Sequence, residues 1–181
     1  MNINVFEKKQ GVNDMVDLRI YENIINAHIT KYAVYEKIEP DSPNGLYIYD
    51  KKSDKWIYIE APIDYFQPKM DGVYVIYYDN AKCPACRVYD IHWFPYVRLL
   101  GSSLDNVYFI VVLCNWFAKD CNSSIASKTF EHYDVHASPT TILLSVKNGE
   151  IVDKEIVEGV KTLDKLAELV EGFMSRNGYK V

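Results

Sequence analysis

The chain has 181 residues, 49% of them hydrophobic, and a formal net charge of −5. A chain of this length buries ~70% of the surface that its unfolded form exposes, so it needs neither disulfides nor a metal to hold a core. The negative charge gives no electrostatic reason to expect a nucleic acid or an anionic membrane as partner. No apolar run reaches membrane-spanning length, so we expect a globular protein without either partner.

The first part of the chain predicts a helix followed by a small antiparallel meander. Apolar residues recur at near-helical spacing over residues 12–28, with Asn13 or Asp14 as the capping residue. Strand-like runs separated by turns follow, at 32–39, 46–50 and 56–60. The first 55 residues are therefore expected to form an extension in front of the main domain.

From about residue 56 onward, strands and helices alternate. Strands are predicted at 72–79, 107–113, 140–146 and 151–159. Helices are predicted from the first cysteine pair to Leu100, at 123–133 with Ser123 or Ser124 as the capping residue, and at 163–176. The last two strands flank a Lys-Asn-Gly-Glu turn and form a hairpin. This order predicts an α/β sheet covered by helices, parallel at first, with an antiparallel hairpin added.

Two cysteines, Cys83 and Cys86, follow the strand at 72–79, and Pro84 and Ala85 separate them. Taken alone, such a pair is compatible with a redox couple, with half of a zinc site, or with two small apolar residues at a helix start. The surrounding pattern decides between these alternatives.

The order of elements resembles that of the thioredoxin-like superfamily. The Cys-Pro-Ala-Cys motif ends the second strand of the alternating part, and Ser138-Pro139-Thr140 precedes the hairpin. The resemblance implies an α/β thioredoxin-like fold, a central mixed β-sheet flanked by helices, for residues 56–181. Residues 1–55 are then an N-terminal helix-plus-meander extension of unknown role. In the family, the proline before the hairpin has a cis peptide bond and lies against the redox disulfide. Pro139 matches it by position.

Thiol–disulfide exchange needs a thiolate nucleophile and a second thiol that resolves the mixed disulfide. Residues three apart at a helix start share one face, so both sulfurs can approach each other. The first cysteine lies beside unsatisfied N–H groups and the positive end of the helix dipole, which stabilise a thiolate. We therefore expect Cys83 to be the attacking, exposed thiol and Cys86, one turn inward, to be the resolving one.

Charged neighbours are expected to tune this pair. Lys82 favours a thiolate at Cys83 and Asp79 opposes it, although both fit equally well as ordinary solvated loop charges. By the resemblance, His136 comes near the disulfide as a proton acceptor or a cation; a histidine without a role is the alternative. The substrate groove is expected to include Pro84, Ala85, Ser138, Pro139 and Thr140.

Several positions depart from thioredoxins. Lys82 stands where thioredoxins commonly have Trp, and Tyr77 stands where they have a buried Asp that assists proton transfer. A phenol is a poor proton acceptor at neutral pH. Ser138 adds a hydroxyl where the family usually carries an aliphatic side chain. Tyr77, in place of this Asp, favours the alternative of a non-catalytic binding module with a vestigial CxxC motif.

The two remaining cysteines, Cys114 and Cys121, allow three interpretations. They form a second disulfide, which suits an oxidising or thermophilic interior, or they join the first pair around one zinc ion. The third interpretation, a buried strand-end thiol and an unbonded loop cysteine, is the one that the sequence slightly favours.

The prediction for function is a thiol–disulfide oxidoreductase that acts on protein or small-molecule disulfides through Cys83 and Cys86. It needs no organic cofactor and no metal, since the two thiols carry the electrons. A disulfide-containing protein is its expected substrate, and a reductase of the thioredoxin-reductase type is an expected electron donor. The N-terminus has no apolar segment of a secretory signal, so we expect a cytoplasmic location.

Overall fold

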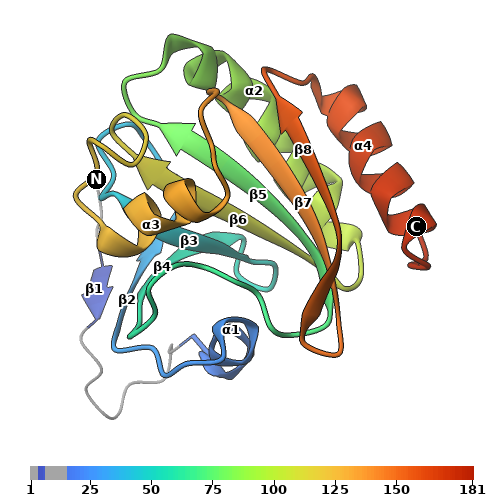
Figure 1. Ribbon diagram of the computed structural model, residues 1–181, viewed down its shortest axis with the longest axis horizontal. Helices are drawn as coiled ribbons and strands as arrows, with labels where there is room; N and C mark the ends of the chain where they lie inside the picture. Colours follow the sequence, from blue (N-terminus) through green and yellow to red (C-terminus); the bar gives the residue numbers. More distant parts are fainter. Residues whose placement is uncertain (1–3, 7–15) are drawn as a thin grey trace.

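Within residues 4–6 and 16–181, which this computed structural model describes, eight strands form one mixed sheet (Figure 1). Their order across the sheet is β1-β2-β4-β3-β6-β5-β7-β8. The strands are β1 (Asn4–Phe6), β2 (Lys31–Tyr35), β3 (Gly45–Asp50), β4 (Lys55–Glu60), β5 (Gly72–Asn80), β6 (Val107–Cys114), β7 (Thr140–Lys147) and β8 (Glu150–Glu158).

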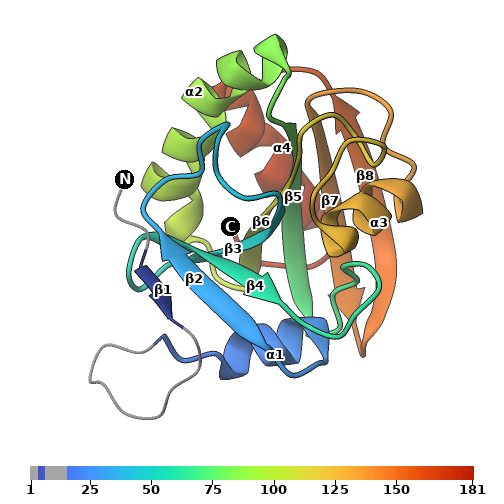
Figure 2. The same ribbon diagram turned by 90° about the vertical axis from the view of Figure 1, so that its left-hand side faces the viewer.

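Helices cover both faces of this sheet. They are α1 (Arg19–Ile25), α2 (Pro84–Leu99), α3 (Ser124–His132) and α4 (Leu163–Arg176), with a short 3₁₀ turn η1 (Gly101–Ser103) after α2. Figure 2 shows α2 and α4 on one side of β5 and α3 on the other. Among the described residues, no helix is both long enough and apolar enough to cross a membrane.

The second half of the chain has the predicted order of elements. Strands β5 and β6 are parallel, whereas β7 is antiparallel to β5 and β8 is antiparallel to β7. Every residue of β5 is buried, as expected for a central strand covered on both faces. The predicted α/β fold, a central mixed sheet flanked by helices, is confirmed.

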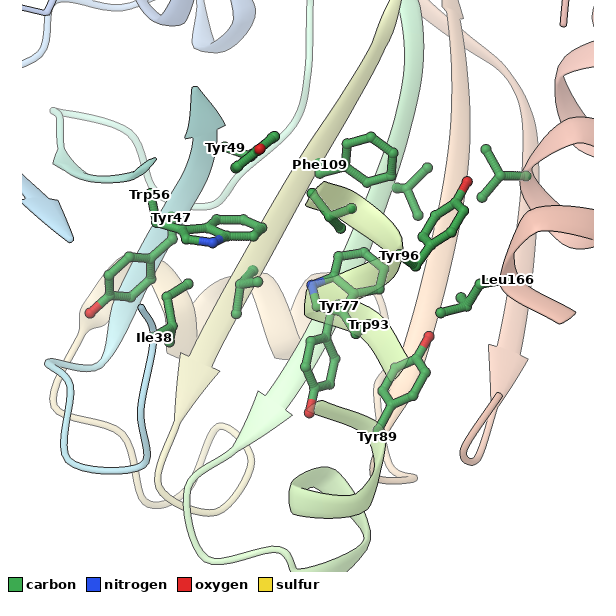
Figure 3. Packing of buried hydrophobic residues seen from close by; sticks show 14 of the residues in the cluster. Ile38, Tyr47, Tyr49, Trp56, Tyr77, Tyr89, Trp93, Tyr96, Phe109 and Leu166 are labelled. Atoms are coloured by element: carbon green, nitrogen blue, oxygen red, sulfur yellow. The ribbon is translucent and has the colours of Figure 1, made fainter. Parts of the chain in front are cut away.

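Alternate residues of β5 serve two separate cores, because successive side chains in a strand point to opposite faces. Val73, Val75 and Tyr77 pack with α2 and α4, while the residues between them pack with α1 and α3. In the first core, Trp93 of α2 lies beside Tyr77 and Phe109, with ring centroids 5.4 and 6.0 Å apart (Figure 3). These fully buried rings fix α2, and with it the cysteine pair, against the sheet.

The N-terminal helix is shorter than the sequence predicted. The expected helix spans 12–28, but α1 begins at Arg19, whose N–H is bonded to the Asp17 carboxylate at 3.1 Å. It ends at Ile25, and the next residue, Asn26, has a left-handed φ of 52° that stops the helix. The expected caps, Asn13 and Asp14, lie outside the described residues.

The predicted meander is wrong in its strand order. Strands β3 and β4 form a hairpin, but β2 pairs with the far edge of β4 rather than with β3. The inner edge of β3 is thereby left for β6, with which it pairs antiparallel. The strand beside β6 is therefore β3, and its hairpin partner β4 lies one position farther from β6.

The proposed division between residues 1–55 and 56–181 does not separate two sheets. It falls inside β4, and β2, β3 and β4 are hydrogen-bonded into the same sheet as the strands that follow. The division remains a prediction about which part of the chain has a counterpart in thioredoxins.

Local signals at other element ends agree with the structure. Ser123 caps α3 by accepting the Ala126 N–H at 3.2 Å, as one of the two serines was expected to do. Asn148 and Gly149, between β7 and β8, have φ values of 54° and 75°, the signs that a tight hairpin turn requires. These features depend on a few neighbouring residues, which is why the sequence predicts them.

Candidate functional site

Cys83 caps the N-terminus of α2. Its backbone is extended (φ −98°, ψ 113°), and its Sγ accepts the Cys86 N–H at 3.1 Å. Pro84 occupies the first turn, where no backbone N–H is needed. The sulfur of Cys83 therefore lies at the positive end of α2, which favours negative charge there.

Cys83 and Cys86 are not bonded to other cysteines, and both are buried. Cys83 is 4% exposed and Cys86 is 0% exposed, which corrects the expectation of an exposed Cys83. The Ser138 carbonyl oxygen lies 3.8 Å from the Cys83 sulfur. Pro84 and Ala85, between the two cysteines, do reach the solvent.

The segment before β7 faces both sulfurs. The Ser138–Pro139 peptide bond is cis. Besides the carbonyl contact to Cys83, the Ser138 hydroxyl lies 3.0 Å from the Cys86 sulfur. Thr140, the first residue of β7, donates its hydroxyl to the Ala137 carbonyl. The fold thus brings Ser138 against the dithiol from a distant part of the sequence.

The surroundings of Cys86 favour the neutral thiol. Burial and the hydrogen bond to Cys83 raise the pKa of Cys86 to about 12, while the hydrogen bond to Ser138 acts in the opposite direction. At neutral pH the thiol of Cys86 is therefore protonated. Cys86 must lose this proton before its sulfur can act as a nucleophile.

A group of charged residues, of which Asp79 is buried and Arg87 and Asp90 are partly exposed, lies beside the dithiol. Arg87 donates to Asp79 at 2.7 Å, and its Nε forms an ion pair with Asp90 at 2.9 Å. Asp79 is 2% exposed, so the interpretation as a solvated loop charge is wrong. Burial, then repulsion from Asp90, raises the pKa of Asp79 to about 7, despite the opposing effect of Arg87.

Tyr77 connects this charge group to the helix of the dithiol. Its hydroxyl lies 2.9 Å from Asp90 Oδ1 and 3.2 Å from the Cys86 carbonyl oxygen, so its one proton is shared between two acceptors. Burial raises the pKa of Tyr77 far above its usual range. The phenol therefore stays protonated and acts only as a hydrogen-bond donor.

Two of the expected tuning residues are paired elsewhere. The Lys82 ammonium forms an ion pair with Asp120 at 2.7 Å, and both side chains are substantially exposed. His136 is bonded to Asp134 at 2.5 Å and its side chain is 80% exposed. The fold directs these two side chains to carboxylates rather than to either thiol.

Cys114 and Cys121 form a disulfide, with Cα atoms 4.6 Å apart. The slightly favoured interpretation of two unbonded cysteines is therefore wrong. Sequence spacing could not decide the point, because the loop between them doubles back so that Asn115 and Trp116 both donate to the Asp120 carbonyl. Within residues 4–6 and 16–181, no group of three or more His, Cys, Asp or Glu side chains is placed to hold a metal ion.

The disulfide-closed loop, residues 114–121, lies against the start of the cysteine motif. Lys82 donates its N–H to the Asn115 carbonyl at 3.1 Å. The Asn80 side chain accepts the Phe117 N–H at 2.6 Å. The sequence pattern did not identify Asn80 as a site residue. Its position could have indicated it, because Asn80 is an amide at the end of a buried strand, three residues before Cys83.

An apolar pocket of about 310 Å³ lies away from the dithiol, between the C-terminal half of α2 and the β3–β4 hairpin. Its walls include Tyr49, Trp56 and Phe94. The Trp56 and Phe94 rings meet edge to face at 5.6 Å. This pocket depends on the N-terminal part of the chain, which the resemblance to thioredoxins does not cover.

No protein-family model matches the chain, and no curated protein matches it. Three solved structures illustrate the similarity in fold. A thioredoxin from Aeropyrum pernix has a TM-score of 0.46 and 15% identity, over 74% of this chain and 98% of that one. A chloroplastic thioredoxin z has a TM-score of 0.41 and 11% identity, over 58% and 80%. Thioredoxin-2 of the malaria parasite has a TM-score of 0.41 and 21% identity, over 59% and 88%.

Proposed function

We propose that the protein is a thiol–disulfide oxidoreductase acting on protein or small-molecule disulfides, in which Cys83 attacks and Cys86 resolves. The observation that supports this most is the position of two unbonded thiols at the start of α2, with Ser138 in contact with both sulfurs. Cys83 accepts a backbone N–H at the helix N-terminus, an environment that stabilises a thiolate.

In the proposed reaction, the Cys83 thiolate attacks a substrate disulfide, forms a mixed disulfide and releases the first substrate thiolate, which takes up a proton. The sulfur of Cys86 then loses its proton and attacks Cys83 Sγ. The Cys83–Cys86 disulfide forms, the bond to the substrate breaks, and the second substrate thiolate takes up a proton. A dithiol donor, such as a reductase of the thioredoxin-reductase type, returns two electrons and two protons to the pair.

The groove proposed for the substrate includes Pro84, Ala85, Ser138, Pro139 and Thr140. Pro84 and Ala85 are exposed beside the buried sulfurs, so a substrate would meet them first. An extended substrate backbone can pair with the chain beside the cis-proline as an added strand.

We propose a cytoplasmic location. The Cys114–Cys121 disulfide provides a way to test it, because the redox state of these cysteines reports on their compartment. Structural disulfides are rare in reducing cytosols but occur inside hyperthermophiles. Rapid alkylation of cells followed by mass measurement of the chain would show whether the bond exists there. Fully reduced Cys114 and Cys121 in cells would fit a reducing cytosol, whereas an intact bond would require an oxidising compartment or a thermophilic interior.

The test of the activity is the reduction of insulin disulfides by dithiothreitol in the presence of the protein. The wild type is expected to accelerate the reaction, and Cys83→Ser is expected to abolish the acceleration. The variant with both Cys114→Ser and Cys121→Ser is the matched control and is expected to remain active. Equal rates for wild type and Cys83→Ser would refute an oxidoreductase.

The second candidate is a non-catalytic binding module, which the apolar pocket between α2 and the β3–β4 hairpin favours. In that case a partner would bind wild type and Cys83→Ser equally well. Trp56→Ala, which removes a wall of the pocket, would weaken the same binding. Dependence of binding on Cys83 would contradict this alternative.

A further inference from the structure

Asn80 is a completely buried amide beside the dithiol, at the end of β5. A buried amide requires hydrogen-bond partners, because leaving its polar atoms unpaired costs free energy. Its Oδ1 accepts the Phe117 N–H at 2.6 Å, and its Nδ2 donates to the Ser138 hydroxyl oxygen at 2.9 Å. Both ends of this side chain are therefore occupied.

These partners determine the direction of each hydrogen bond. A backbone N–H can only donate, so the atom of Asn80 that faces Phe117 is the oxygen. The amide nitrogen, which also only donates, then faces Ser138, and the Ser138 oxygen accepts. The hydroxyl proton of Ser138 must point elsewhere. The sulfur of Cys86, 3.0 Å from the oxygen, is the group in position to receive it.

The loop after β6 fixes the position of the Phe117 N–H, the first donor in this series of hydrogen bonds. Phe117 has a φ of 54°, a conformation that is uncommon for a bulky side chain and persists where its surroundings enforce it. Asn115 and Trp116 both donate their N–H groups to the Asp120 carbonyl, at 2.9 and 3.0 Å. The Cys114–Cys121 disulfide closes the same loop. The N–H of Phe117 is thus held toward Asn80.

We propose that the Ser138 hydroxyl is a catalytic residue of the resolving step: it donates a hydrogen bond to the Cys86 sulfur and stabilises it as a thiolate. Asn80 is a positioning residue that acts through Ser138, and the disulfide-closed loop orients Asn80. This role rests on the proposed thiol–disulfide exchange.

In the resolving step, Cys86 attacks the Cys83 sulfur of the mixed disulfide. The proton of Cys86 ends on the substrate thiolate that leaves, and the electron pair of the broken S–S bond leaves with that sulfur. The Ser138 proton stays on its oxygen throughout. A donor is needed because Cys86 is fully buried and burial disfavours its thiolate.

The experiment mixes the reduced protein rapidly with 5,5′-dithiobis(2-nitrobenzoate), a small disulfide whose released thiolate is coloured. The first release reports attack by Cys83, and the second reports resolution by Cys86. Ser138→Ala is expected to leave the first phase unchanged and to slow the second by about tenfold at neutral pH, the loss expected for one hydrogen bond to a charged group. Its pH profile is expected to move upward by about one unit.

Two further variants separate a catalytic hydroxyl from a structural one. Ser138→Thr keeps the hydroxyl and is expected to restore the second phase. Ser145→Ala removes another fully buried hydroxyl, on β7, and is expected to change neither phase. Asn80→Ala is expected to slow the second phase in the same direction as Ser138→Ala.

The outcomes are distinct. An unchanged second phase in Ser138→Ala would overturn the role of Ser138, and so would a Ser138→Thr variant as slow as Ser138→Ala. A wild type that gives no first phase would refute the proposed oxidoreductase, and the role of Ser138 in resolution would be refuted with it.

Discussion

The two cysteine pairs lie at the same ends of neighbouring strands, yet their surroundings differ. Asn80, just before the first pair, is the register partner of Cys114, where the second pair begins. Cys83 and Cys86 lie at a helix start on the face of α2 and α4, whereas Cys114 packs on the face of α1 and α3. After β5 the chain continues into a helix and its cysteines stay unbonded, whereas after β6 it continues into a loop and its cysteines form a disulfide.

The polar surroundings differ as well. The first pair faces a hydroxyl, and a group of charged residues lies beside it, made of the buried Asp79 and the partly exposed Arg87 and Asp90. The sulfur of Cys121 lies 3.9 Å from the Leu113 carbonyl oxygen and 3.5 Å from the Ser123 carbonyl oxygen. The Ser138 hydroxyl and the Asp79 charge, two groups that can adjust a thiolate, act on the first pair.

The largest expected difference between the pairs is in trapping a mixed disulfide. Cys86→Ser removes the resolving thiol, so Cys83 should stay bonded to a substrate thiol and the adduct should accumulate. In the same protein, Cys114 and Cys121 should carry no adduct, because their sulfurs are already bonded to each other. Peptide mass mapping after incubation with a disulfide substrate checks this. An adduct at Cys114 or Cys121 would reverse the assignment of the two pairs.

Removal of the second pair should affect stability more than activity. A disulfide with a sequence separation of seven closes a short loop. Chain-entropy arguments for such a loop give roughly 2–3 kcal/mol of stabilisation. The variant with both Cys114→Ser and Cys121→Ser should lose about that much free energy of unfolding in urea, and its disulfide-reduction rate should fall by less than about tenfold. A rate as low as that of Cys83→Ser would mean that the second pair takes part in the reaction.

The buried charges beside the first pair should make stability depend on pH. The pKa of Asp79 is raised to about 7, mainly by burial, whereas an unfolded Asp titrates near ~3.9. Between these values the folded state binds more protons, so the free energy of unfolding falls as pH rises from about 4 to about 7.

Asp79→Asn should flatten this pH dependence, since Asn does not titrate. Urea unfolding at several pH values between about 4 and 8 measures the slope. Asp134→Asn, at an exposed carboxylate on the surface, is the control and should leave the slope in place. An unchanged slope in Asp79→Asn would show that Asp79 is ionised over this whole range.

The smallest expected effect comes from the Lys82–Asp120 ion pair, which links the residue before Cys83 to the loop between Cys114 and Cys121. Lys82 and Asp120 are substantially exposed, and exposed ion pairs are weak and screened by salt. Lys82→Ala should change the rate of Cys83 alkylation by iodoacetamide by less than about threefold, and the difference should shrink in high salt. A tenfold loss would mean that Lys82 acts on Cys83 directly.

The sequence predicted the elements of the second half because their signals are local. The apolar alternation of β5, the serine cap of α3 and the Asn-Gly turn of the last hairpin each depend on residues close together in the chain. Motif spacing likewise identified Cys83 and Cys86 at a helix start. The predictions that failed, such as the strand order in the first half, depend on residues far apart in the chain. The residues of a strand do not determine which strands pair with its two edges, so the order β2-β4-β3 was not predicted.

By itself, then, the sequence determined the α/β order, the place of the CxxC motif at the end of a strand and the position of Pro139. Only the tertiary structure decided that Cys114 and Cys121 are bonded and that Asp79 is buried and paired with Arg87. It also decided that the Asn80 side chain donates to the Ser138 hydroxyl, which in turn lies next to the sulfur of Cys86. The physical reason is that burial and hydrogen-bond direction arise from groups far apart in the chain. They become defined only when the sheet places the ends of β5 and β6 and the start of β7 together.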